Sequence, residues 1–210
     1  MGFENNVFVN CPFDEAYYHL LRPLLFTIVG LGYNPRIASE RSDSAENRID
    51  KICNLVEESK YSIHDLSRLR SRRSKEFARM NMPFELGVDY GSRLFGSPLL
   101  RTKKFLILVT RHNDLVDALS DLSGVDVKTH EDKPEDVVRA VRNWFVETVH
   151  QKSTPSPSAI WLRFADFTSD FYDARKAQGY SERDLNMMPV LEYVRFIRSW
   201  FETSGETGLL

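Results

Sequence analysis

Residues 80–91 have the sequence MNMPFELGVDYG, and a continuous apolar run, FLILV, follows at 105–109. Asn81 can cap a helix and Pro83 suits a first helical turn, so we expect a helix to begin near Asn81. Glu85 would then lie in the first turn, where the peptide dipoles favour a negative charge. The apolar run is typical of a strand that is buried on both faces of a parallel sheet.

Shorter apolar runs precede this helix, and polar turns separate them. Working outward from residues 80–91, we expect upstream strands at 7–9, 33–38 and 61–63, with helices at 15–30 and around 49–56. Downstream we expect a short helix at 113–121, a fifth, edge strand at 125–127 and an amphipathic helix at 134–149.

This alternation predicts an α/β fold, with a parallel sheet of about five strands and helices on both faces. In such sheets a ligand binds outside the carboxyl ends of the strands, near a topological switch point. Polar residues that follow the strands should therefore converge there. They are Asn10, Asp14, Ser39, Asp65 and Glu85.

The sequence predicts a main domain at 1–150, a linker at 151–158 that is rich in Pro, Ser and Thr, and a C-terminal helical extension at 159–210. The extension is too aromatic for a solvated tail. We interpret it as a helical hairpin that packs on its own core or on a second subunit, and the first option is the simpler one.

Composition excludes several classes of protein. The hydrophobic share of 42% can fill a core, and a net charge of -2 gives no overall sign favouring nucleic acid or an anionic membrane. Cys11 and Cys53 have no metal-binding spacing and are typical of reduced thiols, so we expect a cytoplasmic protein without a metal. No apolar run is long enough to span a membrane, and no signal peptide is evident. The common nucleoside triphosphate, dinucleotide, metalloprotease and hydrolase motifs are absent.

Glu85 has two interpretations. It can simply stabilise a helix end, an effect worth under about 1 kcal/mol. It can also act as a nucleophile or electrostatic stabiliser at a sugar carbon that becomes oxocarbenium-like. Gly87 and Gly91 follow it, and glycine inside a helix costs about 1 kcal/mol relative to alanine. Two glycines on one face suggest the close approach of a backbone or ligand.

Asp65 ends a predicted strand, where a turn aspartate is common. It could instead hydrogen-bond or protonate a leaving nucleobase. His64 could carry a proton, although a histidine at such a position is more often solvated or hydrogen-bonded. Residues 10–14, NCPFD, could seat a base, with Phe13 stacking on it and Asn10 contacting its edge, or could form an ordinary turn.

Six basic residues lie between 68 and 79, with only Phe77 as an interleaved aromatic. A solvated loop is the favoured interpretation. The alternative is a flap that grips phosphate or a patch for nucleic acid, and the scarcity of aromatic residues argues against a platform for single strands.

The order of three pieces resembles the nucleoside deoxyribosyltransferase-like group, whose wider relatives include nucleotide N-glycoside hydrolases and TIR domains. The pieces are VFVNCPF at 7–13, Asp65, and FELG at 84–87, and the resemblance covers roughly residues 5–150. It implies a flavodoxin-like fold in which Glu85 attacks the anomeric carbon and Asp65 contacts the base. TIR enzymes, which cleave the nicotinamide bond of NAD, resemble the chain less well, because Gly87 and the opening NCPF match the transferase branch.

Arg79 departs from the family, which has an acidic residue or a serine six positions before the nucleophile. That difference makes a phosphate-bearing ligand more attractive than an unmodified deoxyribonucleoside. The candidate catalytic residues are therefore Glu85 and Asp65, and the candidate substrate-binding residues are Asn10, Pro12, Phe13, Ser39, Arg79 and Asn81.

The resulting hypothesis is an N-glycosidase or N-glycosyl transferase that acts on a nucleoside, a nucleotide or NAD. NAD would then be one possible substrate, and we expect no resident cofactor. The resemblance also implies a homo-oligomer and a role in bacterial antiviral defence. Two alternatives remain open: a module that senses a nucleotide without cleaving it, and an interaction domain that assembles through the aromatic C-terminal helices.

Overall fold

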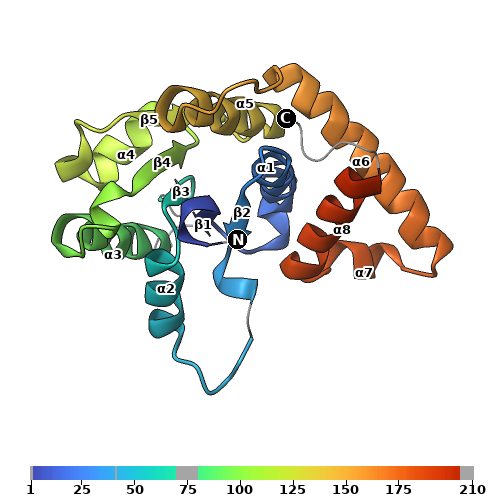
Figure 1. Ribbon diagram of the computed structural model, residues 1–210, viewed down its shortest axis with the longest axis horizontal. Coiled ribbons are helices and arrows are strands. Elements are labelled where there is room, and N and C mark those ends of the chain that lie inside the picture. Colours follow the sequence, from blue (N-terminus) through green and yellow to red (C-terminus); the bar gives the residue numbers. More distant parts are fainter. Residues whose placement is uncertain (1, 41, 70–79, 204–210) are drawn as a thin grey trace.

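The chain forms a five-stranded parallel sheet in the computed structural model, which describes residues 2–40, 42–69 and 80–203 (Figure 1). The strands are β1 (Asn6–Asn10), β2 (Asn34–Arg36), β3 (Tyr61–Asp65), β4 (Lys104–Val109) and β5 (Val127–Thr129). Their order in the sheet is β2-β1-β3-β4-β5. The predicted α/β, flavodoxin-like fold is confirmed, and the order places the switch point between β1 and β3.

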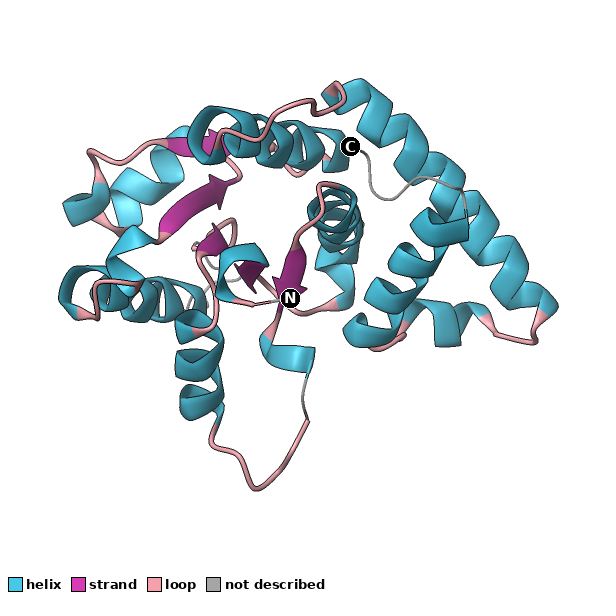
Figure 2. Ribbon diagram, in the orientation of Figure 1, coloured by secondary structure: helices cyan, strands magenta, loops and turns pink. Residues whose placement is uncertain are grey.

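Helices cover both faces of the sheet (Figures 1 and 2). On one face lie α1 (Tyr18–Gly30) and α5 (Pro134–Trp144), and on the other lie α2 (Arg48–Glu57), α3 (Asn81–Phe95) and α4 (His112–Ala118). Short 3-10 turns occupy Phe3–Asn5, Glu15–Tyr17, Ala38–Glu40, Leu100–Thr102 and Ser120–Leu122, and a π-helix, Phe145–Val149, extends α5.

The pleat of the strands divides the core between these two faces, because successive side chains of a strand point to opposite sides. Val7 and Val9 of β1 contact the α1 and α5 side, whereas Phe8 between them packs against α2. In β4, Leu106 faces α1 and α5 and Ile107 faces α3 and α4. β1 and β4 are therefore apolar on both faces, as buried parallel strands should be.

The C-terminal extension consists of α6 (Pro157–Ala177), α7 (Glu182–Asn186) and α8 (Val190–Thr203). These helices pack beside α1 and α5 (Figure 1). The ring of Phe26 in α1 lies 5.5 Å from Phe164, 5.4 Å from Phe167, 5.9 Å from Trp200 and 5.0 Å from Phe201, between ring centroids. The extension thus shares one apolar core with the sheet, which is the simpler of the two predicted options.

Several expected details are wrong. Asn81 is the first residue of α3 rather than its cap, and Glu85 falls in the second turn, beyond the first-turn N–H groups. Pro83 is tolerated as the third helical residue because its missing N–H would have no intrahelical partner there. The expected hairpin contains three helices, not two.

In the described part of the chain, no helix combines the length and the apolar character that crossing a membrane requires.

Replacing Phe167 by alanine tests whether the extension belongs to the main core. Phe167 is buried against Phe26, so Phe167→Ala should lower the free energy of unfolding by about 3–5 kcal/mol, as large-to-small changes of buried aromatic residues do. Leu162 of the same helix is 65% exposed, and Leu162→Ala should change the free energy by less than about 0.5 kcal/mol. Urea unfolding measures both. Equal effects would contradict a shared core.

Candidate functional site

Asn10 ties three elements together at the switch point. It is the last residue of β1, and its side-chain nitrogen lies 2.9 Å from the carbonyl oxygen of Met82 in α3 and 3.0 Å from Nδ1 of His64 in β3. The carbonyl oxygen can only accept, so the amide nitrogen of Asn10 donates one hydrogen to it and the other to His64. The predicted substrate-binding residue Asn10 therefore has both donors engaged within the protein.

The second ring nitrogen of His64 reaches a buried charge network. Because Nδ1 accepts from Asn10, Nε2 carries the hydrogen and donates it to Asp89, with Nε2 3.1 Å from Oδ2. Lys103 places its Nζ 3.2 Å from Oδ1 of Asp89 and also donates to the backbone carbonyls of Val56 and Ser59. The side chains of His64, Asp89 and Lys103 are fully buried.

Burial alone would raise the pKa of Asp89, but the hydrogen bond from His64 and the charge of Lys103 outweigh it and hold that pKa below its usual range. Burial also lowers the pKa of Lys103, and Asp89 opposes this shift. Breaking such a buried pair is strongly destabilising because one charge is left uncompensated. The network therefore fixes the rotation of α3 about its own axis.

Glu85 lies one turn before Asp89 on the same inward side of α3 and is 3% exposed. Its Oε1 lies 3.3 Å from a guanidinium nitrogen of Arg48 in α2, whose side chain is 57% exposed. Burial raises the pKa of Glu85, while the charge and hydrogen bond of Arg48 and the nearby His64 lower it in part. Glu85 is therefore a desolvated carboxyl group with a counter-ion that solvent can reach.

Asp65 is held by a different set of groups. The hydroxyl of Tyr17 donates to Oδ2 at 2.5 Å, and the backbone N–H of Ser67 donates to Oδ1 at 2.8 Å. Nε2 of His130 lies 3.2 Å from Oδ2, close enough for attraction but without hydrogen-bond alignment. The N–H of Asp132 donates to Nδ1 of His130, so the hydrogen of the neutral ring sits on Nε2, facing Asp65.

Burial would raise the pKa of Asp65, but His130, the Ser67 N–H and the Tyr17 hydroxyl together hold it below its usual range. A carboxyl group with a lowered pKa stays ionised at neutral pH. Asp65 is thus suited to accept hydrogen bonds and unsuited to donate a proton.

The pleat sets the two predicted catalytic carboxyl groups on opposite faces of the sheet. Asp65 lies two residues after Ile63 and therefore shares its face, which packs on α1, whereas Glu85 projects from α3 on the face that carries His64. Both charges still reach the thiol of Cys11: burial raises its pKa, and Asp65 and Glu85 raise it further. The two groups therefore flank one buried thiol at the carboxyl edge, and their contact with a single ligand stays a prediction.

The other predicted residues are less closely grouped. Asp14 lies 2.6 Å from Arg68, between Oδ2 and a guanidinium nitrogen, and also contributes to the raised pKa of Cys11. Pro12 is buried, and Phe13 packs against the main apolar cluster.

Ser39 and Asn81 are exposed, and none of the hydrogen bonds described here joins either side chain to the residues around Glu85. Arg79, and with it the predicted basic run from residue 70 onward, lies outside the described residues.

Sequence reasoning did not identify five side chains of this region as partners: Tyr17, Arg48, Asp89, Lys103 and His130. Asp89 could have been found, because it lies four residues after Glu85 and so shares its side of a helix. Arg48, Lys103 and His130 come from other elements, and no local pattern links them to the carboxyl groups that they contact.

A polar cavity of about 740 Å³ opens at the same edge of the sheet, beyond β4 and β5. Its lining residues are Thr110, Arg111, His112, Thr129, Glu131 and Asp132. It adjoins the Asp65 side of the site, because His130 lies between two lining residues and faces Asp65. None of its lining residues belongs to α3. Across the described residues, no cluster of three or more side chains has the arrangement of a metal site.

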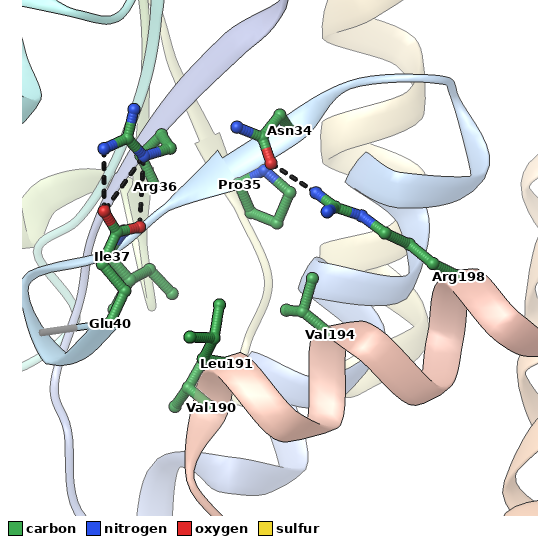
Figure 3. Close-up of a pocket in the computed structure, with 9 residues that line it drawn as sticks. All are labelled: Asn34, Pro35, Arg36, Ile37, Glu40, Val190, Leu191, Val194 and Arg198. Carbon is green, nitrogen blue, oxygen red and sulfur yellow. Dashed lines mark hydrogen bonds and ion pairs between the residues drawn. The ribbon is translucent and has the colours of Figure 1, made fainter. Parts of the chain in front are cut away.

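A second hollow, of about 270 Å³, lies between β2 and α8 (Figure 3). Its charged groups are already paired: Arg198 donates to the side-chain oxygen of Asn34, and Arg36 contacts Glu40 at 2.8 Å (Figure 3). The apolar part comes from Val190, Leu191 and Val194 of α8 and Pro35 and Ile37 near β2. This hollow is a seam between the sheet and the C-terminal extension.

Comparison of the chain with protein-family models, with curated proteins and with solved structures found no match.

The opposite pKa shifts of Glu85 and Asp65 predict opposite effects of neutral substitutions. The folded-state pKa of Glu85 is raised above 4.5, so its charged form disfavours the folded state at neutral pH. Glu85→Gln should raise the melting temperature at pH 7, within the roughly 0.5–2 kcal/mol range of single stabilising changes. The gain should shrink as pH falls through the raised pKa, where the wild-type group becomes protonated when folded.

The folded-state pKa of Asp65 is lowered below 3.8, so its charge contributes stability above that pH and loses the contribution as pH falls through the folded pKa. Asp65→Asn should therefore cost about 1–3 kcal/mol at pH 7 and less below about pH 4. Thermal unfolding across pH 3–8 compares the two variants. Shifts of the same sign at pH 7 would contradict the electrostatic difference.

Proposed function

We propose that the protein cleaves the N-glycosidic bond of a nucleotide-like ligand, with Glu85 acting at the sugar carbon. The observation that carries the proposal is a desolvated carboxyl group with an accessible arginine partner, beside the switch point of a flavodoxin-like sheet. Ligands of such sheets bind at that position. The resemblance of the segments at 7–13, 65 and 84–87 to nucleoside deoxyribosyltransferase-like enzymes supports the same chemistry.

The raised pKa of Glu85 suits a nucleophile, because a more basic carboxylate is a better donor of electrons to carbon. Arg48 favours its ionised form. As the base departs with the bonding electron pair, a Glu85 oxygen would bond to the anomeric carbon or stabilise its positive charge. Water or another acceptor would then release the sugar, and the departing base would take up a proton. Asp65, with its lowered pKa, would accept a hydrogen bond from the base rather than supply that proton.

Two arginines fit a phosphate group on the ligand. Arg48 and Arg68 both pair with carboxylates near this edge, the first with Glu85 and the second with Asp14. Arg48 is more than half exposed, so a phosphate could attract its guanidinium away from Glu85 and uncover the carboxylate. Arg79 as a further phosphate ligand stays a prediction.

A second function, nucleotide binding without cleavage, is favoured by the burial of Glu85. Its carboxylate is nearly inaccessible, and Arg48 lies against it. If Arg48 does not move, no sugar carbon can reach Glu85, and a ligand at this edge would be bound intact.

Glu85→Gln tests the proposal directly. The purified protein would be incubated with nucleosides, nucleoside mono- and diphosphates and NAD, and free base would be measured by mass spectrometry. Release should fall at least about 10²-fold in Glu85→Gln, as expected for loss of a catalytic side chain. Glu57→Gln is the matched control, because Glu57 is an exposed glutamate of α2, and it should release base at the wild-type rate.

Unchanged release by Glu85→Gln would overturn the role of Glu85. Tight binding in calorimetry with intact ligand after long incubation would replace cleavage by sensing. The stability predicted for Glu85→Gln separates loss of chemistry from loss of folding.

A further inference from the structure

α3 carries large apolar side chains on the side that faces away from the sheet as well as on the side that packs on it. Phe95 is 85% exposed, Phe84 60% and Leu94 51%. With 100° per residue, Phe84 and Phe95 lie opposite the buried Met82 and Leu86, and Leu94 lies at one edge of the same outward side. We call the stripe formed by Met80, Phe84, Gly87, Gly91, Leu94 and Phe95 the outer face of α3.

Two glycines occupy the middle of the outer face, and none of the residues that the structure describes explains them. A Cβ atom added at Gly87 or Gly91 would meet no atom within 4 Å among its surroundings. Neither residue has the positive φ that favours glycine. Glycine is a poor helix former, so alanine would suit these positions better in an isolated chain. A close approach by another backbone accounts for both glycines.

The exposed apolar area lies in the upper part of the range for a free surface. At about 200 Å² for each large side chain, the exposed fractions of the four large residues of the outer face correspond to on the order of 500 Å². The four are Met80, Phe84, Leu94 and Phe95. The largest patch on a typical monomer is roughly 300–600 Å², whereas each partner of a standard interface buries about 800 Å². The outer face therefore has more than half of the area that each partner of a standard interface buries.

The stripe is self-complementary. Counted from position 89, Gly87 and Gly91 are equally distant in opposite directions, and so are Phe84 and Leu94. If two α3 helices cross in opposite directions near this position, each Phe84 meets Leu94 of the second copy, and the glycines meet each other. A twofold axis requires this kind of matching, because the same patch must serve both partners.

We propose that the outer face of α3 binds the outer face of α3 in a second copy of the chain, antiparallel about a twofold axis. The stripe contains no charged residue, so two copies meet without like-charge repulsion. The basic segment at 70–79, RSRRSKEFAR, offers only one large apolar residue and is a poor match for this surface. The proposal does not depend on the catalytic role of Glu85, which lies on the inward side of the same helix.

Sedimentation velocity across a concentration series tests the dimer. Wild type should show a concentration-dependent dimer, and Phe95→Glu should raise its dissociation constant at least about tenfold, as loss of a buried aromatic anchor does. Leu162→Glu is the matched control, since Leu162 is an exposed apolar residue of α6, and it should leave the constant unchanged. A monomeric wild type, or equal dimers in wild type and Phe95→Glu, would overturn the proposal.

Gly87→Ala and Gly91→Ala give a second, independent readout. In dilute solution, where the protein is monomeric, each should raise the melting temperature by roughly 2–4 °C, because alanine is the better helix former and has room. At high concentration each should weaken the dimer, because the added methyl groups separate the helices. Dimers of undiminished affinity would disprove the close approach. Binding of a monomeric wild type to neutral phospholipid vesicles would assign the face to lipid instead.

Discussion

The contact between Asp89 and its two buried partners, His64 and Lys103, is the constraint on which the site depends. A charge without solvent is costly unless it is paired and hydrogen-bonded, and Asp89 is both. Lys103 anchors the network to the backbone at the C-terminal end of α2, and His64 anchors it to β3 and, through Asn10, to β1. If α3 rotated by one residue about its axis, the charges of Asp89 and Lys103 would be buried without a partner. The helix therefore has a single stable orientation.

That setting decides which way every other side chain of α3 points. Glu85, four residues before Asp89, is carried inward to the switch point, where burial raises its pKa. Phe84 and Phe95 are carried outward and stay exposed. The same helix therefore carries a desolvated carboxyl group on one side and an exposed apolar stripe on the other. Asp65 contrasts with Glu85, because its donors more than offset the cost of burial and make it a stabilising charge. Destabilised groups are retained in proteins mainly where function requires them.

Local pattern predicted the fold well and the site only in part. The run at 105–109 formed a strand, β4, because five consecutive apolar residues have no alternative but burial on both faces. The expected position of Glu85 in a first turn failed, because Pro83 is compatible with any of the first helical positions and so does not define where the helix starts. The convergence expected for Asp65 and Glu85 on one ligand stays a prediction. Topology predicts that strand ends meet at one edge, but the pleat decides which face each side chain takes.

By itself, the sequence determined the class of fold, the alternation of strands and helices and the apolar nature of the C-terminal extension, since these follow from hydrophobic periodicity. It also placed Asn10, Asp65 and Glu85 near the carboxyl edge. Only the tertiary structure decided that the Asn10 amide donates to His64 and Met82, that Arg48 pairs with Glu85, and that His130 faces Asp65. Those contacts join residues between 37 and 72 positions apart in the sequence. The pKa values of the carboxyl groups depend on burial, which no local pattern encodes.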